Sequence, residues 1–245
     1  MTLARAGRAG LVLLAIESAT VEVGAALWGE DGLLATASER PGRQHAERLH
    51  PLIAEVLDVA GLRPEALGAL AVDRGPGLFT GLRVGIAAAK AIAFGLGLPL
   101  YGLNSTAVLR AAAGERPGGV VAVVDLRRGE VAWSAGTGLE RGSPEALAVA
   151  LAAMAAPLVL VGDGAIRHGA ELVERLVAAG CAAPEIAGDE LAAPPVDVLA
   201  RVGFAAAERG EGGDPFALEP AYLREADVRI NWTTRHDEAR RAVQA

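Results

Sequence analysis

Residues 73–85, with the sequence DRGPGLFTGLRVG, constrain the fold of this chain more than any other segment. A proline and three glycines, at positions 75, 77 and 81, fall between an apolar run typical of a buried strand, Leu67–Val72, and an alanine-rich helical stretch. Because glycine has no Cβ, this order of strand, turn and helix lets the backbone approach an anion or a packed neighbour closely. The segment predicts such a close contact but does not show whether the contacting group is an anion or another part of the protein.

The chain alternates short strands with helices, in an order that predicts an α/β fold. Three opening strands predict an antiparallel meander, at Leu11–Ile16, Val21–Trp28 and Leu33–Ser38. Apolar residues then recur with helical spacing over Arg43–Ala60 and Thr80–Gly95. The remaining expected elements are strand Pro99–Leu103, helix Asn104–Ala113, the hairpin of Val120–Leu126 and Glu130–Ser134, helix Pro144–Ala155, strand Leu158–Val161, and helices Arg167–Ala179 and Val196–Arg209.

A run of strands opens each half of the chain, which predicts two related α/β domains with mixed sheets. We place the first domain at residues 1–103, with the glycine-rich loop, and the second at residues 104–224. Residues 225–245 form a charged tail that we expect to be flexible.

The helix expected over Thr80–Gly95 is apolar nearly all round, and only Arg83 and Lys90 interrupt it. A helix on the surface of a globular protein normally shows one polar face. We therefore expect this helix to be covered on one side by its own sheet and on the other by something else. Thr80 is expected to be its N-cap.

The charge balance limits the partners that this chain can hold by itself. It carries 30 acidic and 23 basic residues, a net charge of −7. Because phosphate backbones are held by clustered Lys and Arg, we expect any RNA to be bound through another subunit. The single cysteine, Cys181, excludes an internal disulfide and suits a cytoplasmic location. The apolar stretches are too interrupted for a good membrane span.

Four stretches together resemble the TsaB (YeaZ) family of bacterial proteins. Leu14–Thr20 (LAIESAT) is similar to the first-strand motif usually written LAIDTST, and Arg43–Leu49 (RQHAERL) to the motif RxHSExL. Gly75–Gly85 is similar to GPGSFTGLRIG, and Pro220–Arg224 (PAYLR) to a P-x-YLR ending. The resemblance covers nearly the whole chain and is tighter in the first half. The glycine loop together with RQHAERL makes it specific.

The resemblance implies the actin, sugar-kinase and Hsp70 ATPase fold, which is ribonuclease H-like, and a role without catalysis. It implies a dimerisation subunit that pairs with a catalytic TsaD-like paralogue, the transferase that makes N6-threonylcarbamoyladenosine at position 37 of tRNA. It further implies a small TsaE-like ATPase as a partner, a homodimer when the chain is alone, and only indirect contact with tRNA.

Residues that would support chemistry are largely missing. Where catalytic paralogues carry two metal-ligating His one helical turn apart, this chain has Ser105 and Leu109, so we expect no metal site. Glu17 stands where the family motif has Asp, and we expect it to cap a turn or hold water. The turn Val161–Ala165 could accept a phosphate, although the carboxylate of Asp163 opposes this.

The resemblance places the helices over residues 45–60 and 80–95 at the pairing surface, where small residues allow close approach. We expect a charge at Ala91 or Leu52 to break pairing and to leave the monomer folded. The residues expected to bind the partner are His45, Leu49, Leu52, Ile53, Val56, Arg83, Ile86, Ala87, Lys90, Ala91 and Phe94. The residues that would contact a nucleotide or anion are Gly75, Gly77, Thr80, Gly81, Gly162 and Gly164.

Two other functions stay open at this point. One is a stand-alone ATP-dependent kinase or ATPase of the same fold, and ATP or ADP is the cofactor it would need. The other is a metallopeptidase, which the missing metal ligands disfavour. As a subunit of a transferase complex, the chain by itself requires no cofactor, and we expect no activity of its own.

Overall fold

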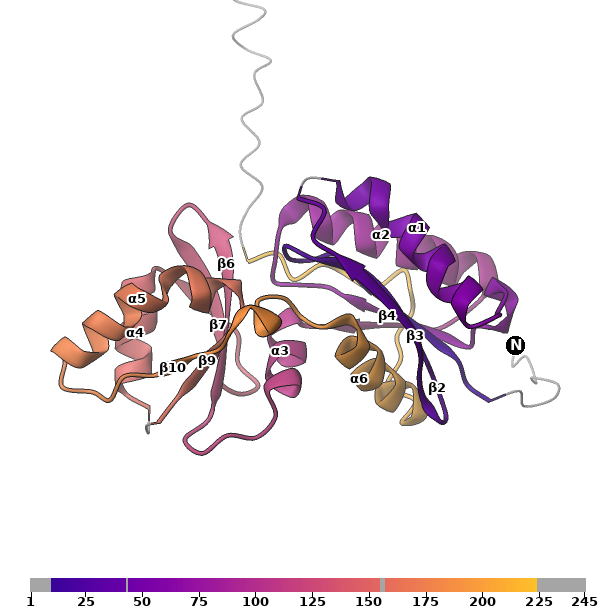
Figure 1. Ribbon diagram of the computed structural model, residues 1–245. Coiled ribbons are helices and arrows are strands. Elements are labelled where there is room, and N and C mark those ends of the chain that lie inside the picture. The colour runs from indigo at the N-terminus through magenta and orange to yellow at the C-terminus, as the bar shows by residue number, and fades with distance from the viewer. Residues whose placement is uncertain (1–9, 43, 155–156, 224–245) are drawn as a thin grey trace, which may run out of the picture.

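The computed structural model describes residues 10–42, 44–154 and 157–223, which form two lobes side by side (Figure 1). Each lobe holds one five-stranded sheet, with strand order β3-β2-β1-β4-β5 in the first and β10-β9-β6-β7-β8 in the second. The charged tail predicted for residues 225–245 lies outside the described residues.

In the first lobe, β1 (Leu13–Glu17), β2 (Val23–Gly29) and β3 (Gly32–Glu39) pair antiparallel, so the predicted meander is confirmed. The strands β4 (Ala69–Asp73) and β5 (Leu100–Leu103) then add in parallel to β1. The helices α1 (His45–Val59) and α2 (Phe79–Leu96) cover one face of this sheet, where the largest apolar core lies.

The second lobe repeats this order. The strands β6 (Val120–Arg127), β7 (Glu130–Ser134) and β8 (Glu140–Gly142) pair antiparallel, and β9 (Val159–Val161) and β10 (Glu185–Ile186) add in parallel. The helices α4 (Pro144–Ala152) and α5 (Asp163–Ala178) cover one face. Two lobes built in one order confirm the predicted fold class, two mixed-sheet α/β units of the actin and sugar-kinase type.

The third helix of each lobe packs on the sheet of the other lobe. The helix α3 (Ser105–Ala113), which follows β5, buries Leu109 and Ala113 against β6 and β9 of the second sheet. The helix α6 (Val196–Glu208) returns to the first sheet, where Leu199 and Phe204 pack on the face opposite α1 and α2. The division at residue 104 stays a prediction, and this exchange of helices is a feature that it did not include.

Several element boundaries differ from the predicted ones. The helix α2 begins at Phe79 after the N-cap residue Leu78, so the prediction that Thr80 is the N-cap is wrong. The helix α5 begins at Asp163, four residues before the predicted start at Arg167, because Gly162 allows the strand to turn directly into the helix. The short strands β8 and β10 were not predicted, since three and two residues carry no readable periodicity.

The segment Phe79–Leu96 passes a length and composition test for a membrane-crossing helix, as the core helices of other proteins also do. Within the described ranges, α2 is the one helix that passes, and 39% of that window is buried inside the protein.

Candidate functional site

Two buried carboxyl groups meet where β1 and β4 end. The register pairs Ile16 with Val72, which places the next residues, Glu17 and Asp73, side by side at the carboxyl ends of two parallel strands. Both side chains are buried. Glu17 Oε1 accepts the N–H of Ala19 at 2.8 Å, which confirms that Glu17 caps a turn.

The two carboxyl groups influence each other's ionisation. Burial, followed by the nearby charge of Asp73, raises the pKa of Glu17 well above its usual value. Burial also raises the pKa of Asp73. The oxygens Glu17 Oε2 and Asp73 Oδ2 are buried and have no hydrogen-bond partner among the described residues. Asp73 Oδ1 already accepts the N–H of Gly75 and the hydroxyl of Ser105, each at 2.7 Å, and such bonds favour its ionised form. Of the two groups, Glu17 is therefore the one that holds a proton more strongly.

The glycines of the loop lie against the turn that follows β1. A Cβ on Gly77 would lie 2.1 Å from the carbonyl oxygen of Ala19, and one on Gly81 would lie 2.0 Å from that of Ser18. Leu78 donates its N–H to the Ala19 carbonyl at 2.6 Å, and the Ser18 hydroxyl donates to the Gly81 carbonyl at 2.8 Å. Contact with a packed neighbour therefore accounts for both glycines, because any side chain would collide with backbone.

The anion site expected at this loop stays a prediction. Thr80 is exposed in the first turn of α2, and Gly75 has a φ of 101°, a conformation that favours glycine. Gly77 and Gly81 already contact protein backbone, as described above.

A second turn of the same kind follows β9 in the second lobe. Gly162 has a φ of 102°, and a Cβ there would lie 2.2 Å from the carbonyl oxygen of Val123; a Cβ on Gly164 would lie 2.9 Å from a methyl of the same residue. Asp163 accepts the N–H of Asp125 at 2.9 Å, and burial raises the pKa of Asp163 to about 6. Nucleotide contact at Gly162 and Gly164 stays a prediction.

The buried carboxyl groups of the two lobes have different neighbours. In the first lobe Glu17 lies beside another carboxyl group, Asp73, whereas in the second lobe Asp125 is paired with arginines. The buried carboxylate of Asp125 forms ion pairs with Arg127 at 2.9 Å and Arg167 at 3.1 Å. Among the described residues, no three His, Cys, Asp or Glu side chains gather closely enough to hold a metal ion.

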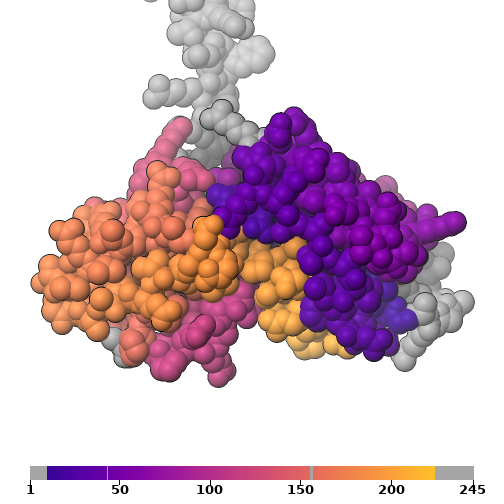
Figure 2. All heavy atoms as spheres, viewed as in Figure 1, coloured from indigo at the N-terminus to yellow at the C-terminus, as the bar shows by residue number. Residues whose placement is uncertain are grey.

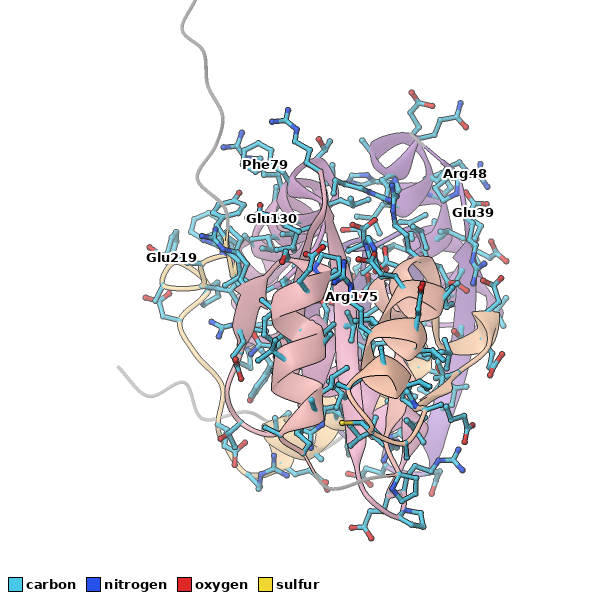
Figure 3. All side chains as sticks on the ribbon, turned by 90° about the vertical axis from the view of Figure 1, so that its left-hand side faces the viewer. Glu39, Arg48, Phe79, Glu130, Arg175 and Glu219 are labelled. Atoms are coloured by element: carbon cyan, nitrogen blue, oxygen red, sulfur yellow. The ribbon has the colours of Figure 1, made fainter. Side chains whose placement is uncertain are left out.

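The apolar face of α1 is turned toward its own sheet. Its charged residues point outward, as Arg48 does where it forms an ion pair with Glu39 of β3 (Figure 3). A charge at Leu52, which is only 3% exposed, would therefore disrupt the core of the monomer, contrary to the expectation that the monomer would stay folded. Buried in the same way are the other α1 residues assigned to partner binding, His45, Leu49, Ile53 and Val56.

The helix α2 shows the opposite arrangement. Its residues Ile86, Ala89 and Ala93 are buried against the sheet, but Phe94 is 68% exposed and Phe79 is 41% exposed. Figure 3 shows Phe79 at the outer surface of the molecule. Helical spacing places on one side of α2 a set of exposed or half-buried residues that we call the α2 face: Phe79, Arg83, Ala87, Lys90, Ala91 and Phe94.

Residues 213–223, here called the strap, run beside the α2 face. Phe216 packs edge-on against Phe94, with ring centroids 5.5 Å apart, and Tyr222 lies 5.3 Å from Phe79. The Arg83 guanidinium donates to the Tyr222 hydroxyl at 3.2 Å. In the sequence, the ending around Tyr222 stands out only as a family motif, because contacts across 139 residues leave no local signal.

Comparison with known proteins places these features in a family. Residues 37–232 match the family model described as TsaD, tRNA N6-adenosine threonylcarbamoyltransferase. The chain is 34% identical over 220 residues to the uncharacterized protein Rv3421c of Mycobacterium tuberculosis, covering 89% of this chain and 93% of that one. The crystal structure of YeaZ from Pseudomonas aeruginosa superposes with a TM-score of 0.71 at 29% identity, covering 87% of this chain and all of that one.

Relatives that carry a functional name match over a shorter length. The Escherichia coli tRNA threonylcarbamoyladenosine biosynthesis protein TsaB is 37% identical over 124 residues, which are 50% of this chain and 53% of that protein. The matched region thus spans about half the length of this relative. With the family model and the YeaZ structure, these matches show that the chain belongs to the TsaD-type threonylcarbamoyltransferase family, in its TsaB (YeaZ) branch.

Proposed function

We propose that this protein is a non-catalytic docking subunit in the biosynthesis of N6-threonylcarbamoyladenosine in tRNA. Its family and its TsaB-named relatives support the pathway. The observation that carries the docking role is the α2 face, where Phe79 and Phe94 stay exposed although the opposite side of the same helix is buried on the first sheet. The partner is a TsaD-like catalytic paralogue, with a TsaE-like ATPase joining the assembly in the cytoplasm.

The chemistry of the α2 face suits a second helix pair. Ala87 and Ala91 let another helix approach closely, and Phe79 and Phe94 at its two ends offer large apolar surfaces. Exposed apolar patches of this kind mark interaction sites, and a stable interface buries roughly 1,600 Å² in total. In the absence of the paralogue, the same face would pair with a second copy of this chain.

The positions where catalytic paralogues bind metal serve packing in this chain, which supports a role without catalysis. Ser105 donates its hydroxyl to Asp73 and lies near the Pro76 carbonyl at 2.8 Å. Leu109 is fully buried on the second sheet.

One observation favours a second candidate, a stand-alone ATPase or kinase. Buried carboxyl groups stand at the ends of parallel strands in both lobes, Glu17 and Asp73 in one and Asp125 in the other, and ligands of open α/β sheets bind at such strand ends. We rank it second because the turn glycines of both lobes are in contact with backbone.

Depletion of the protein from its own cells tests the pathway, with mass spectrometry of bulk tRNA nucleosides as the readout. Loss of N6-threonylcarbamoyladenosine, restored by re-expression, is the expected result. Normal levels after confirmed depletion would overturn the proposed pathway. Hydrolysis of ATP by the purified chain alone, abolished by a substitution at Asp73, would favour the second candidate.

A further inference from the structure

A cavity of about 650 Å³ opens beneath the contact between the lobes, on the side away from α2. Its walls are the end of α3, the loop that leads into β6, and α6. Figure 2 shows the lower edge of the molecule indented between the magenta of α3 and the yellow-orange of α6. Three arginines line it, Arg110, Arg116 and Arg201, and we call it the arginine groove.

The three guanidinium groups have N–H donors left over for further hydrogen bonds. A guanidinium carries five N–H donors. Among the described residues, each of the three arginines donates one hydrogen bond, to a backbone carbonyl. In the ranges that the structure describes, none of the three pairs with a carboxylate. The bonds run from Arg110 Nη1 to Gly136 (2.7 Å), from Arg116 Nε to Ala113 (3.2 Å) and from Arg201 Nη2 to Ala111 (3.4 Å).

One N–H donor of the Arg110 side chain lacks an acceptor. Its Nε is buried and has no hydrogen-bond partner within the described part of the chain. A buried donor without an acceptor is costly, and more so when the group is charged. Because Nε has almost no exposed surface, an acceptor from outside the chain would pair with the terminal nitrogens of the same guanidinium.

The surrounding charges favour an anion. Glu115 on the rim supplies one negative charge against three positive ones. The exposed carbonyls at the end of α3 also repel anions, but Arg116 and Arg201 already occupy those of Ala113 and Ala111. A local excess of positive charge stands out in a chain whose net charge is −7.

We propose that the arginine groove is a phosphate-binding site. Guanidinium groups bind phosphate oxygens through paired, charge-assisted hydrogen bonds. The volume lies within the range of cavities that hold nucleotide-sized ligands. The phosphate belongs either to a small nucleotide or to an RNA backbone. The site does not depend on the proposed docking role, because it lies apart from the α2 face.

Binding to the full-length chain tests the site with three probes: inorganic phosphate, ADP and a fluorescent single-stranded RNA oligomer. We expect saturable binding of at least one probe, weakened at least about tenfold by Arg201→Gln and by Arg110→Gln, and weakened by added salt. The exposed Arg63 provides a matched control, and Arg63→Gln should bind like the wild type.

The outcomes separate the two sources of phosphate. Binding of ADP without RNA assigns a small nucleotide, and binding of RNA without ADP assigns a nucleic-acid backbone. Arg201 is exposed, so its variant tests the site even if the Arg110 variant fails to fold. No saturable binding of any probe, or binding that Arg201→Gln leaves unchanged, would show that these arginines only cap α3 and would overturn the proposal.

Discussion

Glu17 and Asp73 place two buried carboxyl groups side by side at the ends of neighbouring parallel strands. Through its Oδ1 oxygen, Asp73 accepts the hydroxyl of Ser105, the first residue of α3. Since α3 packs on the second sheet, this pair ties the central strands of the first lobe to a helix of the second. The hydrogen bonds of Asp73 therefore belong to the connection between the lobes.

The variant Glu17→Gln should change how stability depends on pH. The raised pKa of Glu17 means that the folded protein keeps a proton that the unfolded chain releases near pH 4.5. The free energy of unfolding should therefore fall as pH rises from that value to the raised pKa, by about 1.4 kcal/mol per unit of pKa difference. Glutamine does not titrate, and its amide N–H can still donate to Asp73. Denaturant unfolding between pH 4 and 9 should show a flatter profile.

Glu65→Gln is the control for that experiment, because Glu65 is exposed. It should keep the pH profile of the wild type. If Glu17→Gln also kept it, the raised pKa of Glu17 would be contradicted.

Gly81→Ala should destabilise the protein by about 1–3 kcal/mol or more, because the new methyl would lie 2.0 Å from the carbonyl oxygen of Ser18. Gly95→Ala makes the same change in the same helix where nothing lies within 4 Å. It should be neutral or stabilising by about 0.5–1 kcal/mol. Equilibrium unfolding measures both, and equal effects of the two would contradict the close packing of the loop.

Ala91→Asp and Leu52→Asp should separate docking from folding. Ala91 is exposed on the α2 face, so a charge there should leave the melting temperature within a few degrees of the wild type and abolish co-elution with the catalytic paralogue. Leu52 is buried in the first core, so a charge there should unfold the chain. Size-exclusion chromatography and thermal melting measure both effects. Normal co-elution of the Ala91 variant would count against the α2 face as the docking surface.

Asp163→Asn should stabilise the protein at neutral pH. Burial raises the pKa of Asp163 from 3.8 to about 6, so the folded state holds the proton more tightly and stability falls between about pH 4 and pH 6. The difference corresponds to roughly 2–3 kcal/mol. The asparagine carbonyl can still accept the N–H of Asp125, so the hydrogen bond at 2.9 Å is retained. Unfolding curves at pH 4 and pH 7 should differ less in the variant, and an unchanged difference would contradict the raised pKa.

Local patterns predicted most of the architecture. The opening meander, the β6–β7 hairpin and the long helices were recognised because apolar residues repeat with a period of two or about 3.6 within one element. The glycine loop was recognised as a point of close approach for the same local reason. The capping role of Glu17 was also expected, since its partner is two residues away.

Tertiary structure alone decided which partner each of these features meets. The sequence left open whether Gly77 and Gly81 contact an anion or protein backbone. In the fold, the turn that follows β1 lies against both glycines. Both long helices looked suited to docking, but α1 buries its apolar side on the sheet and α2 leaves one side exposed. Strand register joins Glu17 to Asp73, 56 positions away, and the returning chain brings Tyr222 to Phe79. Periodicity reports what one element prefers, whereas such contacts depend on how distant elements pack.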